Sequence, residues 1–219
     1  MKKPPYGTRC LVIACHDREE PQFSGIGRIA AELTRRAGGF AVLEWRGGSL
    51  QLRRRRTLDA VIVSGHGAAN RARLRAPGIS FTPECLQLPP RTPLFLLACY
   101  QGRPILRRAW ARGAGIPAAR VYGHDGETES SLSTCLFLHL LAEGLSCLEH
   151  RFEQWREANR YLQPHFARLR RLYAQCNGDP LATLSRLALE ADLAPAADFI
   201  SICRTCPRYL RGLAKARDE

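Results

Sequence analysis

Residues 58–67 read Leu58-Asp-Ala-Val-Ile-Val-Ser-Gly-His-Gly67, an apolar run that stops at a histidine between two glycines. A short, continuous apolar run is typical of a β-strand buried on both faces of a parallel sheet. Similar runs elsewhere in the chain predict four further strands, at 9–15, 40–45, 92–98 and 119–123. The stretch 58–67 therefore predicts a buried strand that leads directly into Gly65-His66-Gly67.

Helical patterns alternate with these strands. Residues 25–36 and 104–113 carry apolar side chains at helical spacing, whereas 68–90, rich in arginine and proline, is expected to be irregular. Strands that alternate with helices predict an α/β fold with a mostly parallel sheet flanked by helices. Beyond residue 126 the pattern is mainly helical, with helices expected at 131–141, 148–162, 166–175 and 180–191.

Composition limits the class of protein. The chain has 219 residues, 45% of them hydrophobic, which is enough to bury a core and excludes an intrinsically disordered chain. The net charge is +13, and only three of the 33 basic residues are lysines, at positions 2, 3 and 215. This charge permits binding to nucleic acid or to an acidic membrane surface without requiring either.

The cysteines and the N-terminus indicate the compartment. There are nine cysteines, an odd number, and several lie inside apolar runs, as Cys10 and Cys15 do. Such cysteines are typically reduced and buried. No apolar run approaches the roughly 20 residues that span a bilayer, and the first apolar run is too short for a signal peptide. We therefore expect a cytoplasmic protein without a membrane span.

Reactive side chains follow two of the predicted strands. In open parallel sheets, ligands and catalytic groups gather at the carboxyl ends of the strands. His66 ends one strand and Cys99 ends another, which would place a base beside a thiol that it can deprotonate. Glycine on both sides of His66 would allow a tight turn there. The Gly67 and Cys99 N–H groups are candidate oxyanion donors.

The two segments that carry these residues resemble those of a known superfamily. Val61-Ile-Val-Ser-Gly-His-Gly67 and Leu96-Leu-Ala-Cys-Tyr-Gln-Gly102 are similar to the His-Gly and Cys-x-x-Gly segments of caspase-like (clan CD) cysteine peptidases. The closest resemblance is to bacterial CHAT-type and metacaspase-like domains, because Gly102 follows Cys99 by three residues, whereas caspases proper have Cys-x-Gly. The resemblance covers about residues 9–160.

The resemblance implies both a fold and an activity. The fold would be a caspase-like sheet of flavodoxin-like strand order in a peptidase domain at 6–160, followed by a helical C-terminal extension at 161–219. The activity would be that of a cysteine endopeptidase in which His66 is the general base and Cys99 the nucleophile, through a thioester acyl-enzyme. It would need no metal or organic cofactor, and a bacterial enzyme of this kind would carry out regulated proteolysis of protein substrates after activation by a partner protein.

Other residues near these strand ends leave alternatives open. His16 and His124 also follow predicted strands, so either is an alternative general base, although neither has glycine on both sides. Asp125 and Glu127, with Glu129 beyond them, follow the last predicted strand and would favour a basic substrate residue. Acidic residues also suit the start of a helix, so this side-chain pattern has a purely structural explanation as well. Three arginines after the histidine would instead select acidic residues, or form a solvated loop: Arg71, Arg73 and Arg75.

Two motifs suggest other chemistry. Residues 25–30 fit the dinucleotide-binding pattern G-x-G-x-x-A, with Glu44 at the end of the next strand. However, the motif needs its first glycine at the turn between strand and helix, and here nine residues separate that glycine from the preceding strand. Cys203 and Cys206 form one C-x-x-C, with only Cys176 and His165 as further zinc ligands. We interpret these cysteines as incidental.

The runner-up function is that of a nucleic-acid-binding or scaffold module, including a catalytically inactive caspase-like domain. Arginine runs at 53–56 and 168–171 would contact phosphates. Aromatic residues make up only 8% of the chain, and no known nucleic-acid-binding motif is present.

Overall fold

A mostly parallel sheet dominates the computed structural model of the chain, which describes residues 9–15, 40–53, 58–76, 79–128, 148–175 and 186. The chain divides into two compact units, 1–134 and 135–219, and each is described by itself. Five strands of the first unit run parallel in the spatial order β2-β1-β4-β8-β9. Their bounds are Cys10–Cys15 (β1), Phe40–Glu44 (β2), Ala60–Ala68 (β4), Leu94–Leu97 (β8) and Val121–Gly123 (β9).

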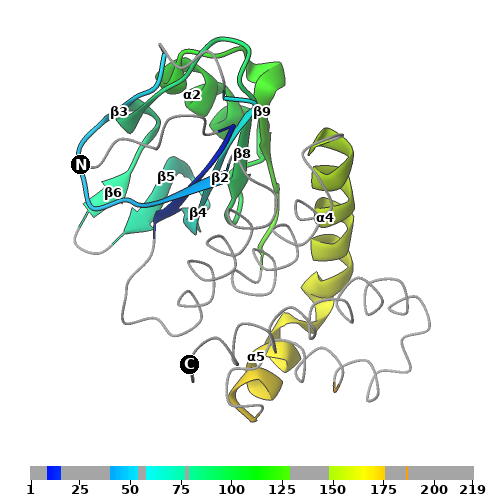
Figure 1. Cartoon of the computed structure of the whole chain (residues 1–219). Helices are drawn as coiled ribbons and strands as arrows, with labels where there is room; N and C mark the ends of the chain where they lie inside the picture. Colours follow the sequence, from blue (N-terminus) through cyan, green and yellow to red (C-terminus); the bar gives the residue numbers. More distant parts are fainter. Residues whose placement is uncertain are drawn as a thin grey trace, which may run out of the picture. The chain divides into compact units, whose positions relative to one another are not determined.

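The order of these parallel strands confirms the α/β prediction. Numbered along the chain, the order is 2-1-3-4-5, which is the flavodoxin-like order of doubly wound sheets. Four of the five strands lie within two residues of the predicted apolar runs, and β4 continues through Gly65-His66-Gly67 to Ala68. Figure 1 shows these strands side by side with helix α2 (Pro104–Ala114) against them. In such a sheet all carboxyl ends of the parallel strands meet at one edge.

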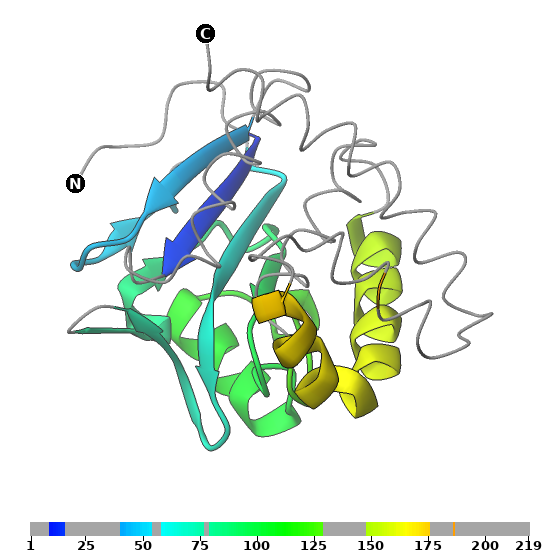
Figure 2. The same ribbon diagram turned by 90° about the horizontal axis from the view of Figure 1, so that it is seen from below.

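The connection at 68–90, expected to be irregular, is largely ordered, so that prediction is wrong. Residue 68 ends β4, and the chain turns back into two antiparallel strands, β5 (Arg71–Ala76) and β6 (Ile79–Phe81). Figure 2 shows β4 continuing into this hairpin. A short helix, η1 (Pro83–Cys85), and a second small sheet of β3 (Leu50–Gln51) and β7 (Leu86–Gln87) complete the region. The alternation of arginine with alanine and leucine at 71–76 was the strand signal.

The prediction of a tight turn at Gly65-His66-Gly67 is also wrong. All three residues belong to β4, and His66 and Gly67 pair with Arg75 and Leu74 of β5. Neighbouring backbone comes close at both glycines, and the β4–β5 register shifts between Gly67 and Ala68. A Cβ added at Gly65 would lie 2.7 Å from the carbonyl oxygen of Cys15. His66 is therefore held on a paired strand rather than on a loop.

Helix α2 covers one face of the sheet. Pro104 suits its first turn, and Leu106, Trp110 and Ala114 form a buried stripe at helical spacing. Gly115 ends the helix in the left-handed conformation, at φ 71°. Trp110 stacks on Phe81 with ring centroids 6.0 Å apart, and burying a large aromatic side chain contributes roughly 1.5–3 kcal/mol.

Side-chain alternation assigns His66 to the face of the sheet away from α2. Val61 and Val63 of β4 belong to the hydrophobic core that contains Trp110. Ser64 takes an alternate position and is also fully buried, so it faces the other side. His66, two residues further along the strand, shares that second face.

The second unit contains α4 (Leu148–Leu162), the short helix η3 (Gln163–His165) and α5 (Phe166–Gln175). Both α-helices lie where the sequence predicts them. In α4, the rings of Phe152 and Trp155 are buried, with centroids 4.9 Å apart. The predicted helices at 25–36, 131–141 and 180–191 fall on residues that, except for Arg186, lie outside the described ones. The predicted division into domains after residue 160 stays a prediction.

Within the described residues, no helix is long and apolar enough to cross a membrane.

Candidate functional site

His66 and Cys99 lie at neighbouring strand ends. Strands β4 and β8 are paired in parallel with Ser64 opposite Leu97, and His66 and Cys99 each follow two residues later. Ala98 belongs to the core on the α2 side, and Cys99 is the next residue, in the turn that follows β8. The structure thus brings the residues predicted as base and nucleophile to neighbouring strand ends at the same edge of the sheet.

Backbone contact at Gly67 shows how closely the two strand ends approach. A Cβ added at Gly67 would overlap the carbonyl oxygen of Cys99 and lie 3.0 Å from both the carbonyl carbon and the amide nitrogen of Cys99. Any side chain at position 67 would push the two chains apart. The glycine after His66 is therefore required by its contact with the residue that carries the thiol.

The sulfur of Cys99 is held by Thr128. The Thr128 N–H donates to Sγ at 3.3 Å, the thiol donates to the Thr128 carbonyl oxygen at 3.4 Å, and the two side chains are 3.5 Å apart. A donor aimed at sulfur stabilises a thiolate, whereas a carbonyl that accepts the thiol proton stabilises the neutral form. Cys99 is half-buried, and in this arrangement its proton faces Thr128.

A strained turn follows the cysteine. Tyr100 has φ 63°, in the left-handed region that residues other than glycine rarely adopt. Its N–H donates to the Gly126 carbonyl oxygen at 2.7 Å, and its hydroxyl donates to Glu127 Oε1 at 2.7 Å. The hydrogen bond to Glu127 is the main reason that the pKa of Tyr100 is raised. The guanidinium of Arg103 lies 4.6 Å from the centroid of the Tyr100 ring.

The turn at 99–103 is bonded extensively to residues 124–128, the segment that follows β9, and Arg103 Nη1 also donates to the Ala69 carbonyl oxygen at 2.9 Å. Besides the contacts of Cys99 and Tyr100, the Gly102 N–H donates to the His124 carbonyl oxygen at 2.6 Å, and Arg103 Nε donates to the Asp125 carbonyl oxygen at 3.3 Å. Every residue of this 124–128 segment therefore bonds to the turn that carries the cysteine. A Cβ at Gly102 would overlap the Gly123 carbonyl, which accounts for the glycine of the Cys-x-x-Gly motif.

Gln101 contributes to the site and was not predicted. It is fully buried, with its amide nitrogen bonded to Ala68 and Cys99 carbonyl oxygens and its amide oxygen accepting from Trp110 Nε1. One sequence offers no signal for such a role, because a glutamine at a turn is ordinarily solvated.

His124 lies at the end of β9, as expected, but inside the protein. Its side chain is only 1% exposed, and Nδ1 accepts the Gly126 N–H at 3.0 Å. That hydrogen bond identifies Nδ1 as the unprotonated ring nitrogen. Burial within the 124–128 segment favours His66 over His124 as a base that reaches a substrate. His16, the other alternative, lies outside the described residues.

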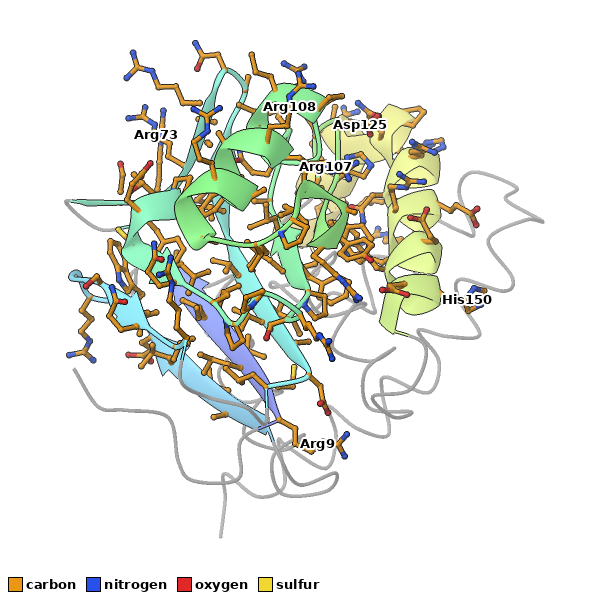
Figure 3. All side chains as sticks on the ribbon, turned by 90° about the horizontal axis from the view of Figure 1, so that it is seen from above. Arg9, Arg73, Arg107, Arg108, Asp125 and His150 are labelled. Carbon is orange, nitrogen blue, oxygen red and sulfur yellow. The ribbon has the colours of Figure 1, made fainter. Side chains whose placement is uncertain are left out.

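The charged side chains predicted to select a substrate residue lie near the turn. Asp125 and Glu127 are both exposed, and Glu127 accepts the Tyr100 hydroxyl. Figure 3 shows Arg9, which precedes β1, and Asp125, which follows β9, at opposite ends of the unit. Glu129 lies outside the described residues.

The three arginines after the histidine lie on strand β5, not on a loop. Arg71 and Arg75 are exposed and Arg73 is half-buried, and the three alternate with inward-facing residues. Arg75 is the cross-strand partner of His66, so the two side chains share one face of the β4–β5 ribbon. The site is thus bordered by positive charge on β5 and by negative charge on the 124–128 segment.

Cys99 differs from the other cysteines whose surroundings the structure describes. Cys10 and Cys15 are fully buried, and burial raises the pKa of both thiols strongly, which leaves them neutral and unreactive. Cys85 is half-buried in η1, with Sγ 3.6 Å from Thr82 Oγ1. Cys15 also ends a parallel strand, opposite Gly65, but it is fully buried in the core, whereas Cys99 is only half-buried at the carboxyl edge.

The motifs for other chemistry find no support among the described residues. The stretch 25–30 lies outside them, and Glu44 at the end of β2 is exposed and paired with Arg46 at 3.1 Å. The C-x-x-C cysteines and Cys176 are also outside, while His165 is half-buried in η3. In the part of the chain that the structure describes, no group of three His, Cys, Asp or Glu side chains is arranged to hold a metal ion.

The arginine runs of the runner-up function are only partly visible. Arg53 is exposed, and 54–56 lie outside the described residues. In α5, Arg168 is half-buried and Arg171 is exposed. Binding to nucleic acid stays a prediction.

The fold and the site define an α/β protein with a cysteine and a histidine at neighbouring ends of its parallel strands. Comparisons of the chain with protein-family models, with curated proteins and with solved structures find no match.

Proposed function

We propose that the chain is a cysteine endopeptidase of the caspase-like kind, with Cys99 as nucleophile and His66 as general base. The observation that carries the proposal is the contact between the two strand ends, where Gly67 is too close to the Cys99 backbone to bear a side chain. The flavodoxin-like strand order and the glycine at position 102 support it.

The chemistry follows from the two side chains. Cys99 Sγ attacks the carbonyl carbon of a peptide bond while His66 takes the thiol proton, and the C–N bond then breaks as His66 gives that proton to the leaving amine. Water attacks the resulting thioester, His66 accepts its proton, and the acid product leaves as the proton returns to sulfur. The Gly67 and Cys99 N–H groups are the proposed oxyanion donors; the Tyr100 N–H already donates to Gly126.

The proposal includes activation by a partner protein in a bacterial pathway of regulated proteolysis. In this structure the thiol donates its proton to the Thr128 carbonyl. Transfer of that proton to His66 requires the thiol to rotate away from Thr128, which a partner that contacts the 124–128 segment would favour. The proposed substrate preference is for a basic residue, read by Asp125 and Glu127, both exposed beside the turn.

The test is cleavage of a peptide panel that differs at the residue before the scissile bond. We expect Cys99→Ala and His66→Ala to abolish cleavage, whereas Cys85→Ala, a half-buried cysteine in η1, retains it. Activity that survives Cys99→Ala would contradict the nucleophile. Activity that survives His66→Ala but is lost in His124→Ala would move the base to the end of β9.

Chemical labelling gives a second readout that needs no activator. We expect iodoacetamide to alkylate Cys99 faster than Cys85 at pH 7, because the proposed general base can accept the thiol proton as sulfur attacks. A wild-type chain that cleaves no peptide and whose Cys99 reacts no faster than Cys85 would contradict the proposed function.

A further inference from the structure

Gln101 occupies a buried position between the core and the site. Its side chain is fully buried, and its amide oxygen accepts a hydrogen bond from Trp110 Nε1 at 2.7 Å. Trp110 is itself fully buried in α2. A buried amide without partners is costly, so this bond anchors the glutamine to a rigid part of the core.

The other end of the amide joins two main-chain segments. Gln101 Nε2 donates to the carbonyl oxygen of Ala68 at 2.9 Å, and it lies 3.4 Å from that of Arg71 and 3.3 Å from that of Cys99. Ala68 ends β4 and Arg71 begins β5, so these two carbonyls belong to the hairpin that extends the strand of His66. The third carbonyl belongs to the residue that carries the thiol.

The chemistry of the amide suits this position. Three carbonyl oxygens on one side require the NH₂ group there, and the indole N–H on the other side requires the amide oxygen. A glutamate would lose the donors, an aliphatic side chain would lose both ends, and an asparagine is one methylene too short to keep both contacts.

We propose that Gln101 is a positioning residue that holds the strand end of His66 against the turn of Cys99. The inference rests on the proposed function, because it concerns the geometry between the base and the nucleophile. Proton transfer from Sγ to the imidazole requires the two groups within hydrogen-bond reach. A displacement of about 1 Å costs on the order of 100-fold in rate in comparable cases, so one amide that ties both segments to Trp110 has a large effect.

The test uses the pH dependence of Cys99 alkylation by iodoacetamide, measured on the Cys99 peptide by mass spectrometry. We expect the wild-type profile to lie at lower pH than that of His66→Ala, since the imidazole accepts the thiol proton as sulfur attacks. Gln101→Met, of similar length, should move the profile toward that of His66→Ala and lower the alkylation rate at pH 7 by about tenfold or more. Gln101→Glu, which keeps the acceptor for Trp110, should move it in the same direction.

Gln87→Met is the matched control. Gln87 is a half-buried glutamine of β7 whose Nε2 donates to the Gly113 carbonyl at 2.6 Å, so its loss removes a comparable bond elsewhere in the unit. We expect it to lower the unfolding temperature without moving the alkylation profile. Under peptide cleavage, the Gln101 variants should lose kcat while KM stays within about twofold.

The outcomes separate the two proposals. If wild type differs from His66→Ala but neither Gln101→Met nor Gln101→Glu changes the profile, the positioning role of Gln101 is wrong while the proposed function stands. If wild type and His66→Ala have the same profile, the His66–Cys99 pair itself is wrong, and the role of Gln101 with it. A shift in Gln87→Met equal to that in Gln101→Met would reduce Gln101 to a general structural residue.

Discussion

Gly67→Ala places a methyl group in the seam between the two strand ends. The added Cβ would overlap the Cys99 carbonyl oxygen and approach two further backbone atoms of Cys99 to 3.0 Å. Ordinary carbon contacts lie at about 3.5–4.0 Å, and the obstacle is backbone, which has no rotamer to change. The strand of Gly67 and the turn of Cys99 must therefore separate.

The magnitude follows from the cost of overpacking. Adding a methyl group to a close-packed site costs about 1–3 kcal/mol, which in a domain of 150–250 residues lowers the unfolding temperature by roughly 2–4 °C for each kcal/mol. We therefore expect a loss of roughly 2–12 °C. Because the separation falls between His66 and Cys99, we also expect peptidase kcat/KM and the Cys99 alkylation rate to fall by tenfold or more, on the order estimated for sub-ångström to ångström displacements.

Gly65→Ala is the matched control for this prediction. Its Cβ would lie 2.7 Å from the Cys15 carbonyl oxygen, so it strains the same strand at the neighbouring seam with β1. Both variants are measured by thermal unfolding and by alkylation of Cys99. We expect both variants to lower the unfolding temperature, and only Gly67→Ala to lower the alkylation rate of Cys99 strongly. If the two variants lower the Cys99 alkylation rate equally, or if Gly67→Ala leaves that rate unchanged, the reasoning is wrong.

Three further predictions concern the surroundings of the site. Trp110→Phe removes the donor to the buried Gln101 amide oxygen and should destabilise the fold by about 1–3 kcal/mol in chemical unfolding, whereas an unchanged midpoint would contradict that bond. Burial raises the pKa of the Cys15 thiol, so its contribution to stability is complete below the pKa of the unfolded thiol, about 8.5, and is lost as the pH rises above that value. The Cys15→Ala variant should therefore show a smaller fall in unfolding temperature between about pH 8 and pH 10 than the wild type does. An unchanged pH dependence of the unfolding temperature would contradict this prediction. The hydrogen bond to Glu127 raises the pKa of Tyr100, so the Tyr100 phenol should ionise at lower pH in Glu127→Gln. The measurement is phenolate absorbance against pH, with Tyr100→Phe as the reference. Ionisation of the phenol at the same pH as in the wild type, or higher, would exclude the bond.

The parallel sheet could be predicted from the sequence because its strands carry their own signal. The strands β1 and β8 are continuously apolar, and β4 begins with the apolar run Ala60-Val-Ile-Val63, as is typical of strands buried on both faces. The helix α2 was equally clear, with a proline at its start and a glycine at its end. Apolar runs and helix-end residues are patterns of a few neighbouring residues, so they can be recognised in a single sequence.

The hairpin of β5 and β6 was missed for a physical reason. Arg71, Arg73 and Arg75 made the segment look like a solvated loop, although the alternate positions hold the buried Leu74 and the partly buried Ala72. A strand with one charged face and one apolar face gives only the weak period-two pattern. Its proline- and glycine-containing surroundings concealed that pattern further.

The site could be predicted only as far as strand ends allowed. His66 and Cys99 were predicted to lie near each other because each follows an apolar run, and the carboxyl ends of parallel strands converge. Thr128 and Gln101 were not found, since one acts through its main chain and the other through contacts with carbonyls distant in sequence. Neither kind of contact leaves a pattern in side-chain types.

The 124–128 segment supports the cysteine turn largely through main-chain groups. The carbonyl oxygens of His124, Asp125 and Gly126 accept three of its bonds, and the Thr128 N–H supplies a fourth. Main-chain bonds persist whatever side chain a residue carries. Point substitutions at position 125 can therefore reverse the charge beside the turn while the main-chain bonds that support the sulfur stay intact.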